Sequence, residues 1–145
     1  MAKKGSASTY IPSGAAEYSR KHKVNESKGE CSAYVKRSLT STDAGKVNDN
    51  EYFSGVDACT CSAWMPYFGF KIVCTGDTKP CPSNFTPMDG DIMVNAGIAR
   101  TSDKTKYGHV SIFKQGIGWI ADFASNGPGC YSDASKRNFW VIFRK

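Results

Sequence analysis

The feature that most constrains the fold is a change of hydrophobic period along the chain. Apolar residues in the first part recur at helical spacing, whereas the later part consists of short β-branched and aromatic runs separated by turn residues. Helices followed by consecutive strands predict the α+β class, with the N-terminal helices packed on an antiparallel sheet. A length of 145 residues, of which 40% are hydrophobic, predicts one domain over residues 13–145, preceded by a flexible basic arm over residues 1–12.

The first part of the chain predicts three helices, of which the first and the third are described here. Ser13 is placed as an N-cap with Glu17 in the first turn, which predicts a helix to about Lys23. A third, shorter helix is predicted near residues 56–67, where apolar residues continue at helical spacing.

The second helix carries the first candidate site residue. Ser27 and Glu30 have the spacing of a capping box, and Cys31, Val35 and Leu39 follow at intervals of four residues. This pattern predicts an amphipathic helix with Cys31 in its first turn. We expect that helix to pack on one face of the sheet.

Five later runs predict the strands. They are short, rich in β-branched and aromatic residues, and bounded by Gly, Pro, Asn and Asp. They cover residues 70–73, 91–95, 109–113, 118–123 and 139–143.

Residues 109–123 predict a hairpin with Gln115 and Gly116 at its tip. A two-residue loop sets position 114 opposite 117 and therefore His109 opposite Asp122. Opposed side chains have Cβ atoms about 4.5 to 5.5 Å apart, within reach of an imidazole–carboxylate hydrogen bond. A bulge would shift the pairing by one residue.

An imidazole oriented by a carboxylate is the base and orienter of a nucleophilic triad, and Cys31 is placed to supply the nucleophile. At a helix N-terminus the macrodipole favours an anion, so the pKa of its thiol is expected to fall. Structural explanations compete with this one. On spacing alone, Cys31 is more often a small buried hydrophobe, and a His–Asp pair is as often structural as catalytic.

Composition excludes several classes of protein. No apolar run is long enough to span a bilayer, and the start, MAKKGSASTY, lacks the hydrophobic segment of a secretory signal. The six cysteines do not form paired C-x-x-C motifs, and His22 and His109 are the only histidines, so neither a metal nor a cofactor is expected. The net charge of +6 suits anionic partners, but scattered cations without a recognised motif make nucleic-acid binding the weaker alternative.

Four segments in order, GECSAYVKRSL, GDIMV, YGHVSIF and GWIADF, resemble the NlpC-type and CHAP-type papain-fold hydrolases that cut bacterial peptidoglycan. The chain is most similar to small single-domain forms, namely phage lysins, virion hydrolases and type VI secretion amidase effectors. The resemblance implies a papain-like fold and a Cys-His-Asp mechanism with Cys31 as nucleophile, His109 as base and Asp122 as third residue. It also implies Tyr18 as an oxyanion donor beside the backbone N–H of Cys31, with no metal. The resemblance implies that the bond cut is a stem-peptide amide or the muramoyl–alanine amide.

The resemblance further implies that the protein acts at the cell wall or in the periplasm, delivered by a phage or a secretion system. Its partners are then peptidoglycan and an immunity protein or a phage or secretion structural protein, but no membrane. Disulfides are consistent with that location. Cys74 with Cys81, and Cys59 or Cys61 with Cys130, are candidate pairs. Two alternatives stay open: a noncatalytic wall- or nucleic-acid-binding module, and a papain-fold protease or deamidase acting on proteins.

Overall fold

The computed structural model describes residues 10–24, 31–45, 65, 70–76, 79–95, 109–121, 124–125 and 140–145. Within them the elements are α1 (Pro12–His22), α2 (Cys31–Thr40), β1 (Lys71–Thr75), β2 (Ile92–Asn95), β3 (His109–Lys114), β4 (Gly118–Ile120), β5 (Ala124–Ser125) and β6 (Trp140–Arg144).

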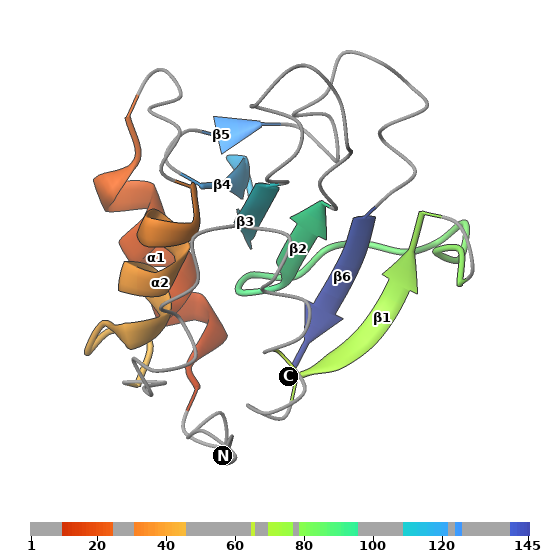
Figure 1. Ribbon diagram of the computed structural model, residues 1–145, viewed down its shortest axis with the longest axis horizontal. Helices are drawn as coiled ribbons and strands as arrows, with labels where there is room; N and C mark the ends of the chain where they lie inside the picture. Colours follow the sequence, from red (N-terminus) through yellow and green to blue (C-terminus); the bar gives the residue numbers. More distant parts are fainter. Residues whose placement is uncertain are drawn as a thin grey trace, which may run out of the picture.

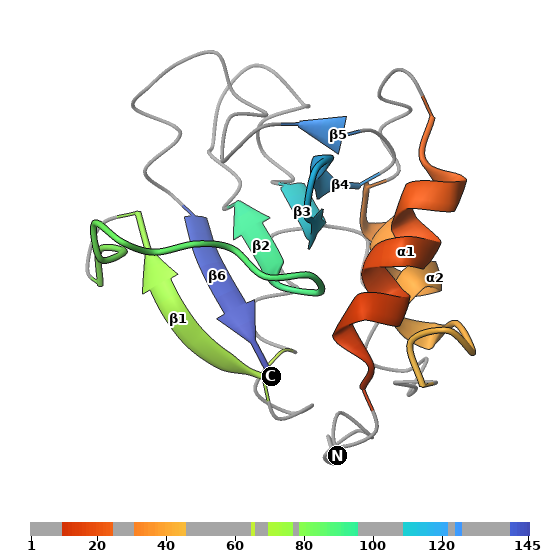
Figure 2. The same ribbon diagram turned by 180° about the vertical axis from the view of Figure 1, so that it is seen from behind.

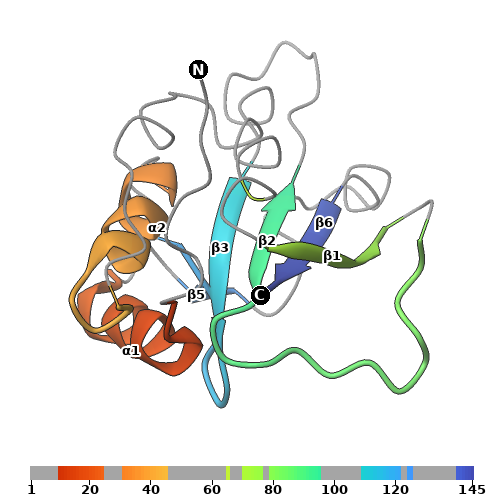
Figure 3. The same cartoon turned by 90° about the horizontal axis from the view of Figure 1, so that it is seen from below.

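The strands form one sheet in the order β1-β6-β2-β3-β4-β5, and every neighbouring pair is antiparallel (Figure 1). Both helices pack against β3, and α1 also contacts β4. Figure 3 shows the helices together on one side of the sheet. The predicted α+β class, with N-terminal helices on an antiparallel sheet, is confirmed.

The start of α1 differs from the prediction. The helix begins at Pro12, one residue before Ser13, and Ile11 is the N-cap without a side-chain hydrogen bond. Proline is suited to the first helical position because its φ is preset and it has no N–H to leave unpaired. Tyr10 is 4% exposed, so the folded region begins N-terminal to the expected boundary at Ser13.

The second helix spans Cys31–Thr40, in agreement with the predicted amphipathic helix and with Cys31 in its first turn. Ser27 and Glu30, which form the expected capping box, lie outside the described residues, as does the predicted helix over residues 56–67 apart from the buried Met65.

One hydrophobic core lies between the helices and the sheet (Figure 2). The residues at helical spacing in α1 and α2 face alternate residues of β2 and β3, as amphipathic helices on a pleated sheet require. The members from these elements are Ala15, Ala16, Val35, Leu39, Ile92, Val94, Val110 and Ile112.

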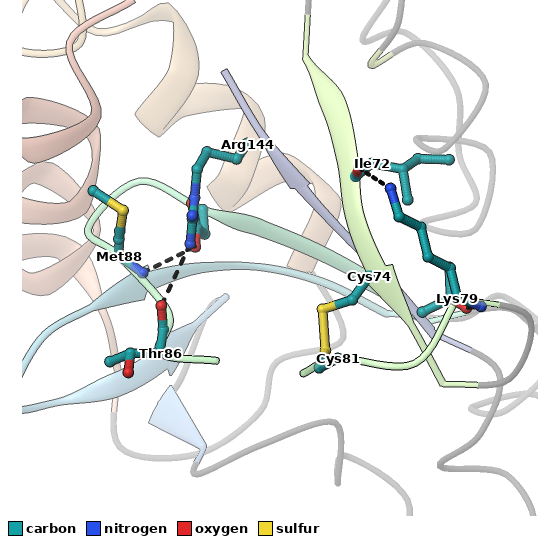
Figure 4. Close-up of a disulfide and its surroundings, with 9 residues drawn as sticks. Ile72, Cys74, Lys79, Cys81, Thr86, Met88 and Arg144 are labelled. Atoms are coloured by element: carbon teal, nitrogen blue, oxygen red, sulfur yellow. Dashed lines mark hydrogen bonds and ion pairs between the residues drawn. A yellow bond between two sulfur atoms is a disulfide. The ribbon is translucent and has the colours of Figure 1, made fainter. Parts of the chain in front are cut away.

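A second cluster covers the other face of the sheet. Cys74, Met93, Trp119 and Ile142 form it, and Phe85 from the connection between β1 and β2 packs against it. The Cys74–Cys81 disulfide ties this connection to β1 (Figure 4). One of the candidate pairings is therefore present, whereas Cys59, Cys61 and Cys130 lie outside the described residues.

The register of the β3–β4 hairpin corrects the predicted one. Lys114 pairs with Gly118, so the loop has three residues, Gln115 to Ile117, instead of two. The Ile117 N–H donates to the Lys114 carbonyl at 3.1 Å, and Gly116 has a φ of 83°, the positive value that the third position of a type II turn needs. The predicted two-residue loop, from which His109 was set opposite Asp122, is therefore wrong, whereas Asp122 itself lies outside the described residues.

Candidate active site at the starts of α2 and β3

One end of the fold is defined by three hydrogen bonds. The Ile11 N–H donates to the Ala44 carbonyl at 3.0 Å, the Tyr10 hydroxyl donates to the Gly90 carbonyl at 2.9 Å, and the Gly90 N–H donates to the Phe113 carbonyl at 3.0 Å. These bonds hold four segments next to one another: the start of α1, the turn after α2, the residues directly before β2 and the last part of β3. The two helices are therefore antiparallel, and α2 runs toward the end of the fold where β3 finishes.

The opposite end holds the first residues of α2 and β3. A ten-residue helix rises about 15 Å and a six-residue strand about 20 Å, so each element spans most of the distance from that first end. Figure 1 shows β2 ending and β3 beginning at the upper side of the sheet. The tertiary structure thus brings the backbone of Cys31 and that of His109 to the same end of the molecule, although they are far apart in sequence.

Close packing of α1 on α2 sets the position of the second helix. The Ser19 and Ser38 hydroxyls are hydrogen-bonded at 2.7 Å, and the Ser38 hydroxyl donates to the Tyr34 carbonyl at 3.0 Å. Both serines are buried. A buried hydroxyl pair of this kind is directional, so it fixes the rotation of α2 as well as its distance from α1.

On the sheet, His109 is paired with Asn95 of β2. Asn95 is fully buried, at 0% exposure, in a strand that also pairs with β6, where its partner is Trp140. Ser111, two residues further along β3, is equally buried and pairs with Met93. Polar side chains at 0% exposure are uncommon in a strand interior. The sequence analysis missed them, since nothing local distinguishes a buried Asn from an exposed one.

Tyr18, the expected oxyanion donor, is half-buried on α1, one turn before the helix ends. Its ring is stacked on His22, with ring centroids 3.9 Å apart and planes 17° apart. Nδ1 of His22 lies 2.8 Å from the Tyr18 carbonyl oxygen. Because α1 and α2 are antiparallel, this stacked pair lies toward the end of the fold where α2 begins. Asp122, the expected third residue, lies outside the described residues.

The strongest electrostatic feature lies at the other end of the fold. Arg144 donates from Nε and Nη2 to the two carboxylate oxygens of Asp91, at 2.8 and 2.7 Å, and Figure 4 shows Arg144 with its neighbours. The Met88 N–H also donates to Asp91, at 2.9 Å. Hydrogen bonding to Asp91 raises the pKa of Arg144. Burial is the main cause that raises the pKa of Tyr10, and the negative charge of Asp91 is the second cause. The Asp91–Arg144 pair anchors the β1–β2 connection to the sheet. The sequence analysis missed it because its members are 53 residues apart.

A second charged cluster lies on the surface beside α1. Glu17 accepts hydrogen bonds from Arg20, and these bonds, with the Arg20 and Lys114 charges, lower the pKa of Glu17 to about 2 against the opposing effect of desolvation. Lys114 lies 3.6 Å from Glu17 and 3.4 Å from Asp89. The cluster links α1 to the β3–β4 hairpin.

Neither a metal site nor a membrane span is found in the part of the chain that the structure describes. No group of three or more His, Cys, Asp or Glu residues there could hold a metal ion. None of the helices in those same ranges is long and apolar enough to cross a bilayer.

No protein-family model matches the chain, and no curated protein matches it. Two solved structures do. The first is a chain of the crystal structure of the type VI native effector-immunity complex Tae3-Tai3 from Ralstonia pickettii, 21% identical, with a TM-score of 0.68 over 93% of this chain and 98% of that one. The second belongs to the selenomethionine form of that complex, 20% identical, with a TM-score of 0.63 over 91% and 99%. The chain shares the fold of these proteins.

The arrangement can support nucleophilic chemistry. A thiol on the first residue of a helix lies where the macrodipole favours its anion. His109 is the first residue of β3, the strand against which both helices pack.

Proposed function

We propose that this protein is a cysteine hydrolase that cuts an amide bond of peptidoglycan and acts as an interbacterial effector delivered by a type VI secretion system. The observation that carries the proposal is the shared placement of the starts of α2 and β3, where the resemblance assigns the nucleophile Cys31 and the base His109. The fold supports it as well, because it matches chains of a type VI effector–immunity complex over nearly its whole length.

The proposed reaction is acyl transfer through a thioester. His109 takes the thiol proton, and Cys31 Sγ attacks the amide carbonyl while the backbone N–H of Cys31 and the Tyr18 hydroxyl stabilise the oxyanion. His109 then protonates the leaving amine. Water, deprotonated by His109, attacks the thioester, releases the carboxylic acid and returns the free thiol. The chemistry needs no metal or cofactor.

Asp122 completes the proposed triad through the resemblance alone. The observed register of the β3–β4 hairpin does not pair it with His109. Its role is therefore tested directly by Asp122→Asn, which keeps the shape of the side chain and removes the charge.

The biological setting follows from the same comparison. A type VI effector that cuts the wall works in the periplasm of the target cell, and its producer needs an immunity protein that blocks it. We assign such a protein as the partner. The net charge of +6 supports a polymer rich in carboxylates and phosphates as the substrate, because long-range attraction raises the encounter rate.

The deciding experiment is digestion of purified Gram-negative peptidoglycan by the wild type, Cys31→Ala and His109→Ala, with the released fragments identified by mass. Defined stem-peptide cuts by the wild type alone support the proposal, and the fragment masses name the bond. If the wild type binds the wall but does not cut it, the binding-module alternative replaces the proposal. If it cuts or deamidates proteins but not peptidoglycan, the protein-directed alternative replaces it.

A further inference from the structure

We propose that the outer edge of β1 is a surface on which a second copy of this chain can pair, strand to strand. Residues 79–81 cover this edge while the Cys74–Cys81 disulfide is formed, and reduction of the disulfide opens it. In the sheet that the structure describes, β1 is the outermost strand, paired on one side with β6. Edge strands present N–H and C=O groups to which another strand can add, so proteins usually cover them.

The register of β1 on β6 shows which backbone groups point outward. The Gly76 N–H donates to the Trp140 carbonyl of β6 at 3.0 Å. In an antiparallel pair, opposed residues alternate between pairs that exchange hydrogen bonds and pairs that do not. The β6 residues one and three positions beyond Trp140 therefore direct their groups toward β2. Their β1 partners, Thr75 and Ile72, direct their own backbone groups away from β6.

Lys79 covers both of these outward-facing positions. Its carbonyl oxygen accepts a hydrogen bond from the Thr75 N–H at 2.7 Å, and its Nζ donates to the Ile72 carbonyl at 3.2 Å. The Lys79 N–H also donates to Thr75 Oγ1, at 2.8 Å. Figure 4 shows Lys79 beside β1 with its side chain reaching Ile72. A lysine over an edge strand is a common means of preventing another strand from adding.

The disulfide is the covalent link that holds residues 79–81 in this place. Cys74 is fully buried on β1, whereas Cys81 is only partly buried, so a reductant can reach the bond. Each hydrogen bond of Lys79 replaces a bond to water, so its net contribution is small. Once the link is cut, the conformational entropy of the connection therefore favours release of Lys79 from the edge.

The chemical change is thiol–disulfide exchange. A dithiol reductant converts the Cys74–Cys81 disulfide into two thiols and is itself oxidised to a disulfide. Thiols stay reduced in the cytoplasm, whereas disulfides form in the periplasm and outside the cell. The β1 edge is accordingly covered in oxidising compartments and open in reducing ones.

A second copy of this chain fits the open edge. Antiparallel pairing of two β1 strands about Val73, the middle residue of Lys71–Thr75, sets Lys71 of one copy opposite Thr75 of the other. Like charges are therefore not directly opposed. Ile72 is 46% exposed and adds apolar surface to the contact. Because both copies use the same strand, the contact closes as a dimer.

The first test is amide hydrogen exchange on the full-length protein. Reduction by dithiothreitol should speed exchange of the Thr75 amide roughly 50-fold, the factor that chain entropy gives for a loop of this length. In the reduced protein this exchange should not respond to low urea concentrations, because a local opening exposes little surface. Amides of the β2–β3 ladder should exchange more slowly and respond to urea. An unchanged rate at Thr75, or a urea response equal to that of the ladder, overturns the proposal.

A variant without the two cysteines separates this disulfide from the other cysteines of the chain. Cys74→Ala/Cys81→Ala should exchange at Thr75 like the reduced wild type, with or without dithiothreitol. If the reductant speeds Thr75 exchange in this variant as much as in the wild type, other cysteines cause the effect and the proposal is overturned.

The second test measures molar mass by light scattering after size exclusion, over a concentration series. The oxidised wild type should stay a monomer. The wild type in dithiothreitol should shift toward a dimer as its concentration rises, because the opened edge can then pair. Equal molar masses for the oxidised and reduced proteins overturn the proposal.

Ile72→Pro shows whether the association uses β1. The Ile72 N–H points away from β6, so a proline there keeps the β1–β6 ladder but blocks strand addition. Ile72→Thr removes the same apolar side chain and keeps the N–H. Under reducing conditions Ile72→Pro should stay a monomer and Ile72→Thr should still dimerise, whereas equal association of the two overturns the proposal. Ile72→Lys, which blunts the edge by charge, replaces Ile72→Pro if that variant lacks a native circular dichroism spectrum.

Discussion

Gly14 of α1 lies directly against the main chain of Asp43, in the turn that follows α2. A Cβ at position 14 would be 1.7 Å from the Asp43 carbonyl oxygen. The two helices can therefore approach each other here only without a side chain. This contact and the Ser19–Ser38 hydrogen bond together hold α2, and with it the helix start at Cys31, in a single position relative to α1.

Gly14→Ala tests that contact, because the contact reverses the sign of the expected change in the free energy of unfolding. In an isolated helix the change stabilises by about 1 kcal/mol, because Ala has the higher helix propensity. Here the added methyl group meets backbone that cannot yield cheaply, and overpacking costs about 1 to 3 kcal/mol. We expect urea unfolding to show a net loss of stability, whereas the exposed neighbour variant Ser13→Ala should be nearly neutral. A more stable Gly14→Ala protein would contradict the packing described.

The Asp91–Arg144 pair predicts an asymmetry between its two truncations. Asp91 is 1% exposed, whereas the Arg144 side chain is 31% exposed. Arg144→Ala leaves a buried carboxylate without its partner and should cost about 3 to 5 kcal/mol in the free energy of unfolding. Asp91→Asn leaves a guanidinium that solvent reaches, and should cost less, about 1 to 3 kcal/mol. Chemical denaturation of both variants checks the order, and the reverse order would refute this explanation.

The Cys74–Cys81 disulfide should contribute to stability through the unfolded state. Its loop is short, with a sequence separation of 7, for which chain-entropy arguments give about 2 to 3 kcal/mol. We expect the wild type to lose at least this much on adding a reductant. Cys81→Ser, measured without reductant, should be less stable than the oxidised wild type by about the contribution of this link. A Cys81→Ser protein as stable as the oxidised wild type would show that the link contributes nothing.

The pKa of Glu17 predicts a small acid-dependent effect. This carboxyl titrates at about 2 instead of its ordinary 4.5, mainly because Arg20 donates hydrogen bonds to it. A lowered folded-state pKa stabilises the folded protein above the unfolded value, and the contribution is lost as the pH falls from about 4.5 toward 2. The stability difference between wild type and Glu17→Gln should therefore shrink over that range. High salt should reduce it at every pH, because solvent reaches the group.

Thiol reactivity tests the proposed nucleophile without a substrate. Cys31 should be alkylated by iodoacetamide at half-maximal rate well below the pH of about 8.5 that a free thiol shows, because the helix N-terminus and a nearby imidazolium favour its thiolate. His109→Ala should move this midpoint upward. Peptide mapping by mass spectrometry distinguishes Cys31 from the other cysteines. An unshifted midpoint in both proteins would argue for a structural cysteine.

Local patterns in the sequence predicted the elements well. The short β-branched and aromatic runs predicted β1, β2, β3, β4 and β6, and the four-residue spacing from Cys31 predicted α2. These features depend on neighbours within one turn or one strand, so the chain near each residue determines them. The start of α1 was misplaced by two residues, from an N-cap at Ser13 to one at Ile11, because Pro12 occupies the first helical position more favourably than Ser13 caps the helix.

What only the tertiary structure decided concerns residues far apart in sequence. The pairing of His109 with Asn95, the ion pair of Asp91 with Arg144 and the contact of Gly14 with Asp43 each depend on how whole elements pack. A single extra residue in the β3–β4 loop shifts every described pair in that hairpin by one residue. Because side chains in a strand alternate between the two faces of the sheet, this shift moves each β4 side chain to the face opposite to the predicted one. The sequence by itself determined both described helices and five of the six described strands, and it supplied the candidates for the reactive residues. Packing and register decided which of those residues meet, because both depend on interactions summed over the whole core and not on any one segment.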